Sequence, residues 1–353
     1  MRKYILSFMC LALSLCAIAK DNKGIVTENL NAGGFTLISQ SHPVTLLVAD
    51  NDKKGVLIAA SNLQKDFERV CGSKAALLNA PSPDTKRYVI AGTLESSYIK
   101  QIVKAKKIDE KELKGKVEKY LMTVVDNPLP GVDEALVIAG SDMRGTIYGI
   151  YELSEQIGVS PWYDWMDVPA VRHTNLAIQK GTYTAGEPAV RYRGLFLNDE
   201  APCLTSWVKN TFGTNYGGHE FYARVFELIL RLRGNYLWPA MWMWTFYGDD
   251  PLNSPTANDM GVIMGTSHHE PMARNHQEWA RHRNEYGAWN YNTNKEVIKK
   301  FFREGIERMK GTDDIVTIGM RGDGDEAMSD EADTRLLEQI VVDQRKIIEE
   351  VTG

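Results

Sequence analysis

The N-terminal half of the chain alternates between short apolar runs and longer amphipathic segments. Three segments have the apolar spacing of helices: 55–70, 96–105 and 146–157. Four short runs rich in branched and apolar side chains have the composition of strands: 44–48, 88–92, 120–125 and 135–139. Gly158 directly follows the third helical segment, which suits a left-handed residue at a helix end. The pattern predicts a small α/β domain over residues 20–184.

The pattern changes near residue 185, where Gly181, Gly186 and Pro188 indicate a linker. Beyond it, four apolar runs predict strands: 193–197, 234–238, 261–265 and 315–320. Three amphipathic segments predict helices: 220–233, 296–309 and 331–351. Strands that alternate with helices indicate a parallel sheet. The fold class is therefore α/β, with about four βα units after the small N-terminal domain.

Four βα units are half of a (β/α)8 TIM barrel. Half a barrel has two open sheet edges and an uncovered core, which is unfavourable. Either the sheet is complete as a small open fold, or residues 185–353 are the first half of a barrel and the chain is an incomplete fragment. Residues 350–353 directly follow a predicted helix, where the next strand would begin, and this favours the fragment.

The first residues resemble a secretory signal peptide. Arg2 and Lys3 precede an apolar run over 5–18, and a small-x-small pattern ends at Ala19. The run is short for a membrane-spanning helix, which needs about 20 apolar residues. A lipoprotein signal ending at Cys16 is a weaker alternative, because Leu15 stands where a small residue is expected. We expect residues 1–19 to be removed and the protein to be exported to the periplasm or the medium.

Composition and charge narrow the classes of partner. Of the 353 residues, 43% are hydrophobic and 25% charged, and the formal net charge is −5. An acidic chain without basic clusters is a poor ligand for nucleic acid or an anionic membrane. Cys71 and Cys203 lie far apart, so no disulfide framework is indicated, and neither has the spacing of a metal site. We expect no cofactor.

The acidic turn at 321–326 is the first candidate for chemistry. Hydrolysis of a glycosidic bond needs two carboxyl groups, and Asp323, Asp325 and Glu326 supply carboxyls close together. Arg321 suits a substrate carboxylate, which its planar guanidinium can bind through two hydrogen bonds. The alternative is a solvated turn that caps the next helix, and the turn alone does not separate the two interpretations.

Two other predicted strands end in polar residues. Asn198, Asp199 and Glu200 follow the first strand, and His268 and His269 follow the third. Because ligands bind at the carboxyl ends of parallel strands, we expect all five side chains to bind the substrate, together with Asp323 of the acidic turn. Adjacent histidines in an extended segment point to opposite faces, so a hydrogen-bonding role toward sugar hydroxyls or a uronate is favoured over a metal.

The loop after the second strand is rich in aromatic side chains. Trp238, Trp242 and Trp244 lie within seven residues of one another. Sugar rings stack on aromatic faces, so one or two of these side chains are expected to line the site, although core packing is the stronger interpretation for any single one.

Together these segments resemble a known family. Four segments carry the resemblance: 192–200, 235–242, 265–272 and 320–326. They look like the xylan α-1,2-glucuronidases of glycoside hydrolase family 115. Segment 140–149 resembles the small α/β domain that precedes the barrel in this and related glycosidases.

The resemblance implies removal of glucuronic acid or 4-O-methylglucuronic acid from glucuronoxylan or another uronate-decorated polysaccharide, with inversion. It matches Asp199, Trp242, His268, Arg321 and Asp325 to residues that line the uronate pocket. Asp325 is the expected essential carboxylate, with a role as general base as a hypothesis. The family's acid residue would lie beyond Gly353, and full-length members often form homodimers.

Two other functions stay open at this point. A non-catalytic glycan-binding protein would keep the pocket without the second carboxyl group. A metal-dependent hydrolase would use the histidines of the third strand end.

Overall fold

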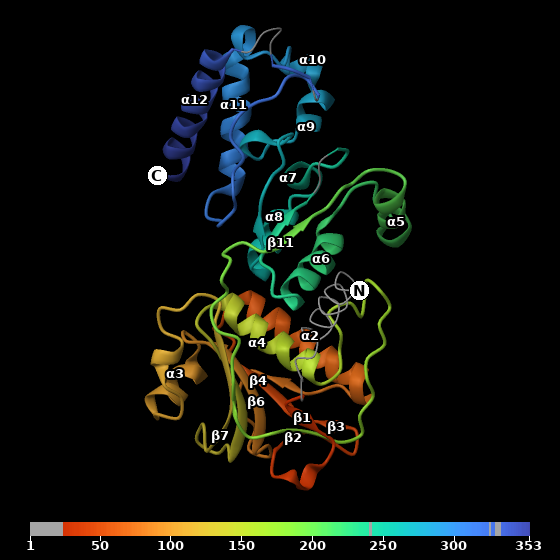
Figure 1. The fold of residues 1–353 in the computed structure, drawn as a ribbon, viewed down its shortest axis with the longest axis vertical. Helices are drawn as coiled ribbons and strands as arrows, with labels where there is room; N and C mark the ends of the chain where they lie inside the picture. Colours follow the sequence, from red (N-terminus) through yellow and green to blue (C-terminus); the bar gives the residue numbers. More distant parts are fainter. Residues whose placement is uncertain (1–23, 240–241, 325, 329–332) are drawn as a thin grey trace, which may run out of the picture.

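The computed structural model describes residues 24–239, 242–324, 326–328 and 333–353. The signal peptide expected over residues 1–19 lies outside these ranges. Within them, no helix combines the length and the apolar character needed to cross a membrane. Figure 1 shows an elongated molecule, with the N-terminal sheets at one end and α11 and α12 at the other.

A six-stranded sheet forms the centre of the N-terminal part. Its order is β10 (Thr182–Tyr183), β7 (Tyr120–Asp126), β8 (Glu134–Gly140), β6 (Arg87–Thr93), β4 (Thr45–Val48) and β5 (Leu77–Leu78). The strands from β8 to β5 are parallel, whereas β7 is antiparallel to β8. The four predicted strands of this part are all present. β6 and β8 are almost fully buried, which explains their continuous apolar sequence.

A second, four-stranded antiparallel sheet was not predicted. Its order is β1 (Val26–Thr27), β9 (Leu176–Ile178), β2 (Phe35–Ser39) and β3 (His42–Pro43). Two of its strands have two residues each, too few to show any periodicity.

The three predicted helices of this part are present as α2 (Lys54–Cys71), α3 (Ser97–Lys104) and α4 (Met143–Gln156). Short 3-10 turns occur at Leu30–Ala32 and Glu110–Glu112. Asp142 caps α4 because its side chain accepts from the Gly145 N–H at 2.8 Å. Gly158 has φ 108°, the left-handed conformation expected for it.

The second part contains a three-stranded parallel sheet. Its order is β11 (Gly194–Phe196), β12 (Tyr236–Trp238) and β13 (Ile263–Met264). Four helices lie between these strands: α5 (Cys203–Phe212), α6 (His219–Arg231), α7 (Phe246–Asp249) and α8 (Asn253–Met260). After β13 come a 3-10 turn and four further helices: η3 (Pro271–Ala273), α9 (His276–Arg281), α10 (Arg283–Tyr286), α11 (Tyr291–Met309) and α12 (Thr334–Thr352).

The prediction of a fourth strand at 315–320 is wrong. The segment runs beside β13, since the Ile315 N–H donates to the Met264 carbonyl at 2.8 Å. It forms no ladder, because both backbone groups of Gly319 bond the side chain of Gln344, at 2.7 Å each. Gly319 also has φ 113°, which is incompatible with a strand.

The N-terminal part packs on the outer helices of the second part. α4 contacts α6, and α2 contacts α8. In Figure 1, α2 and α4 lie on the side of the N-terminal sheets that faces the second part. At the amino ends of β11 and β12, the carboxylate of Glu118 from the N-terminal part accepts from Arg193 at 2.6 Å and from Asn235 at 2.8 Å. Arg193 and Asn235 directly precede β11 and β12. The amino ends of these strands therefore face the N-terminal part, and their carboxyl ends face away from it.

Candidate functional site

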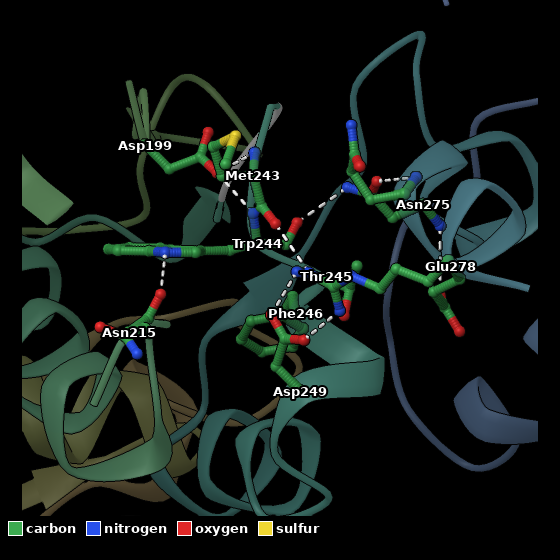
Figure 2. A network of polar contacts seen from close by, with 12 residues as sticks. Asp199, Asn215, Met243, Trp244, Thr245, Phe246, Asp249, Asn275 and Glu278 are labelled. Carbon is green, nitrogen blue, oxygen red and sulfur yellow. Dashed lines mark hydrogen bonds and ion pairs between the residues drawn. The ribbon is translucent and has the colours of Figure 1, made fainter. Parts of the chain in front are cut away.

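Asp199 lies just beyond β11 and is fully buried. Its carboxylate accepts three backbone N–H groups from the loop after β12: Trp242 at 2.7 Å, Met243 at 2.6 Å and Trp244 at 2.7 Å. Figure 2 shows the carboxylate beside the backbone of Met243 and Trp244. Three short, charge-assisted bonds fix the shape of this loop, so Asp199 connects two strand ends.

Asn198 and Glu200, on either side of Asp199, are exposed. The Glu200 N–H donates to the Asn198 side-chain oxygen at 3.1 Å. This local turn directs Asp199 inward while both neighbours face solvent. Their predicted role in substrate binding stays a prediction.

The three tryptophans of the β12 loop differ in environment. Trp244 is 2% exposed, and its indole N–H donates to the Asn215 carbonyl at 3.0 Å. Trp238 is 37% exposed and meets Phe196 edge-on at 5.6 Å between ring centres. Trp242 is half-buried, and its Nε1 atom is buried without a hydrogen-bond partner among the described residues.

His268 and His269 lie in a turn after β13 rather than in an extended segment. The expectation that they point to opposite faces is therefore wrong, since their ring centres are 4.2 Å apart. His268 is exposed, whereas His269 is buried and lies 5.2 Å from the Trp242 ring. The two rings and Trp242 thus form one aromatic group at the ends of β12 and β13.

Glu270 is a buried carboxyl group that we did not select from the sequence. It is 2% exposed and accepts from the Ser267 N–H and the Asn275 amide, at 3.1 Å each. Burial raises the pKa of the Glu270 carboxyl to about 8, and the carboxylates of Asp199 and Glu278 act in the same direction. The sequence could have indicated Glu270 only through its position directly after the two histidines. An acidic residue at that position is also common in a solvated loop, so the position alone does not indicate a buried site residue.

The turn at 321–326 is held from outside by α9, α10 and the segment before α11. The Asp323 carboxylate pairs with Arg283 and lies 3.0 Å from the His276 ring. The Arg283 guanidinium holds the pKa of the Asp323 carboxyl below its usual value. The Trp289 indole donates to the Arg321 carbonyl at 2.8 Å.

Asp323 is predicted to bind substrate, whereas in the structure its carboxylate contacts Arg283 and His276. Arg321 is half-buried in the same turn. Asp325 lies outside the described residues, so its expected role stays a prediction. Within the described ranges, no three side chains of His, Cys, Asp or Glu are grouped so as to hold a metal ion.

Comparison with known proteins identifies the family. Residues 185–353 match glycosyl hydrolase family 115. The structure also matches a solved family 115 protein with 32% identity and a TM-score of 0.78. This chain belongs to glycosyl hydrolase family 115. Its family 115 relative is described as a 4-O-methyl-α-glucuronidase, BtGH115A, with specificity for decorated arabinogalactans. The match covers 90% of this chain and 41% of that relative.

The N-terminal part of this family 115 chain has a second match. Residues 38–153 match the N-terminus of glycosyl hydrolase family 67. A mutant Streptomyces plicatus β-hexosaminidase in complex with its product GlcNAc matches with a TM-score of 0.50 over 91% of this chain and 62% of that one. Its identity is 10%, so it shows similarity of fold alone. None of the curated proteins matches the chain.

Proposed function

We propose that this protein is an exported α-glucuronidase, or a part of one, that removes glucuronic acid or 4-O-methylglucuronic acid from a plant polysaccharide with inversion. The observation that carries the proposal is membership of family 115, together with a relative described as a 4-O-methyl-α-glucuronidase. Xylan and decorated arabinogalactan are the two candidate substrates. The chain spans 41% of that relative, so the activity of the whole enzyme is part of the proposal.

The strand ends supply groups that suit a uronate. The buried Trp242 Nε1 can donate to a sugar oxygen, and the exposed His268 lies beside the same aromatic group. Arg321, in the turn after the 315–320 segment, suits the substrate carboxylate. Asp199 acts on this site through the loop that carries Trp242.

Asp325 is proposed as the general base. An inverting glycosidase needs a second carboxyl group roughly 6.5–9.5 Å away, with the attacking water between the two. We propose that this general acid belongs to a region of family 115 enzymes that the present match does not cover.

The test uses glucuronoxylan oligosaccharides and glucuronidated arabinogalactan with the enzyme in its natural full length. Proton NMR should show release of uronic acid, with the β-anomer appearing first, because inversion at an α-glucuronide gives that product. Asp325→Asn should lower turnover by at least about 100-fold with little change in glycan binding, since it removes only the base. Glu326→Gln, in the same turn, is the matched control.

Three results would contradict the proposal. Near-normal turnover of Asp325→Asn would remove the assigned base. Binding of the oligosaccharide without release of uronic acid would favour a glycan-binding protein. Loss of turnover on treatment with a chelator would favour a metal-dependent hydrolase.

A further inference from the structure

Asn275 lies at the amino end of α9, between the turn after β13 and the helix. It is 2% exposed. Its side-chain oxygen accepts from the Gln277 N–H at 2.7 Å and caps α9. Its side-chain nitrogen donates to the Trp244 carbonyl at 2.9 Å and to Glu270 at 3.1 Å. Figure 2 shows Asn275 between Trp244 and Glu278.

These two donated bonds complete a line of contacts across three strand ends. Asp199, after β11, accepts from the Trp244 N–H at 2.7 Å. The carbonyl of Trp244, after β12, then accepts from Asn275 at 2.9 Å. Asn275 also donates to Glu270, whose other oxygen accepts from Ser267, after β13, at 3.1 Å. One amide group therefore joins the β12 loop to the β13 turn.

Among side chains of this size, only an amide can make all three of these hydrogen bonds. Its nitrogen carries two hydrogens for two acceptors, and its oxygen accepts the capping N–H. A carboxylate would place a second oxygen against the Trp244 carbonyl and the Glu270 carboxyl group. Buried acceptors left without a donor are unfavourable by roughly 1–3 kcal/mol each.

We propose that Asn275 is a positioning residue of the family 115 site. Through its two donated hydrogen bonds it sets the β12 loop, which carries Trp242, against the β13 turn, which carries His268 and His269. The effect on turnover rests on the proposed glucuronidase function, whereas the effect on the two loops does not.

The competing explanation is that Asn275 only caps α9. Aspartate caps helices as well as asparagine does, so Asn275→Asp keeps the cap and removes the two donors. Asn290→Asp is the matched control. Asn290 is exposed and caps α11 by accepting from the N–H groups of Asn292 and Thr293 at 3.0 and 3.3 Å.

Turnover of a glucuronidated oligosaccharide is the first readout. At pH 9, above the pKa of about 8 of the Glu270 carboxyl, Asn275→Asp should lower kcat by up to about 100-fold with a smaller change in KM, as misplacement of site groups does. Lowering the pH should restore part of kcat, because a proton shared between the new carboxyl and Glu270 supplies a donor again. The other charged groups near the Asn275 amide are the same in every variant, so they do not account for a difference between variants. These groups are Asp199, Glu278, Arg274 and Arg308.

A second variant keeps the test decisive if Asn275→Asp folds poorly. Combining it with Glu270→Gln reverses the donor and the acceptor of their bond. The double variant should recover part of kcat relative to Asn275→Asp alone, whereas a pure capping role predicts no recovery. Equal kcat for Asn275→Asp and Asn290→Asp would overturn the proposal.

An NMR readout separates this proposal from the proposed function. The backbone amide resonances of Ser267 and of residues 242–244 should shift together in Asn275→Asp and stay in place in Asn290→Asp. This result is expected even if the wild-type protein releases no uronic acid, an outcome that would contradict only the glucuronidase proposal. Unshifted resonances in Asn275→Asp would overturn the positioning role.

Discussion

At the scale of single residues, the acids of the strand ends are set apart by their surroundings. Asp199 accepts from three backbone N–H groups, which fix the loop that carries Trp242. Glu270 receives two donated bonds, but burial dominates and favours its neutral form. Asp323 pairs with Arg283 at the surface of the turn and stays charged. Glu270 and Asp323 thus take different charge states, although both are carboxyl groups.

Glu270 gives a prediction for stability against pH. Its pKa is raised in the folded protein, to about 8. Its contribution to stability is therefore fully present below its unfolded pKa and is lost as pH rises toward 8. The free energy of unfolding of the wild type should fall over this window, with a limiting slope of about 1.4 kcal/mol per pH unit. Glu270→Gln should remove this component.

Urea unfolding at pH 5 and pH 8 measures the effect. The control is Glu95→Gln, because the Glu95 side chain is 73% exposed and should leave the wild-type pH dependence intact. The same pH dependence in Glu270→Gln and wild type would show that burial does not shift this group.

At the scale of elements, the packing of helices across the two parts depends on a buried ion pair. Asp66 on α2 is fully buried and accepts from Arg231 on α6 at 2.8 Å. Arg231 also bonds Glu227 at 2.8 Å, and its guanidinium lies 4.5 Å from the Tyr151 ring centre. This polar group connects α2, α4 and α6 inside an otherwise apolar layer.

Arg231→Met should destabilise the protein by roughly 3–5 kcal/mol, because it removes the buried partner of the Asp66 carboxylate and leaves it only the partly exposed Arg69. Urea unfolding at neutral pH measures the change. Lys53→Met is the control. It removes an ion pair with Glu95 whose side chains are 56% and 73% exposed, and such pairs contribute about 0–1 kcal/mol. A loss below 1 kcal/mol for Arg231→Met would contradict the expectation.

Several elements that the sequence predicted correctly are long enough to show a period. α2, α4, α6 and α11 each carry an apolar face over three or more turns, and β6 and β8 are long apolar runs. α7 and α10 have four residues each, which is about one turn, and their sequences carry no comparable pattern. The strand predicted at 315–320 failed because the Gln344 side chain, 25 positions away, takes the backbone bonds of Gly319.

The sequence predicted that polar residues after successive strands lie together, but not which contacts each of them makes. Asp199 bonds the Trp242 N–H, and the Trp242 ring lies beside His269, at the carboxyl ends of β11, β12 and β13. Asp199 holds the β12 loop through backbone N–H groups that lie 43 to 45 positions further along the chain. Asp323 pairs with Arg283, which lies on α10, 40 positions earlier in the chain. Contacts at such separations leave no pattern in a single sequence.

At the scale of the whole molecule, the β11 edge of the second part exposes apolar side chains. β11 lies at an edge of the three-stranded sheet. Leu195 and Phe196 are 38% and 45% exposed, and Trp238 on β12 is 37% exposed. An exposed edge strand with apolar side chains is a site for pairing with another chain. We therefore expect the 353-residue chain on its own to associate with itself.

Light scattering over a range of protein concentrations measures this association. Leu195→Lys should lower the average mass, since a charge on an edge strand opposes pairing. Leu252→Lys is the control, because Leu252 is 50% exposed and lies outside the sheet. A constant monomer mass for the wild type, or an equal effect of both substitutions, would contradict the role of the β11 edge.

The bonds of Asn275 also bear on how such enzymes can be recombined. A chimera with its crossover between residues 245 and 266 would take the Trp244 carbonyl from one parent and Asn275 with Glu270 from the other. Parents whose β12 loops place this backbone carbonyl differently would give a mismatched junction even if each loop were unaltered. Residues 199–278 should therefore be transferred as one segment in a chimera. Substrate preference should pass from one relative to another when this segment is exchanged as a whole.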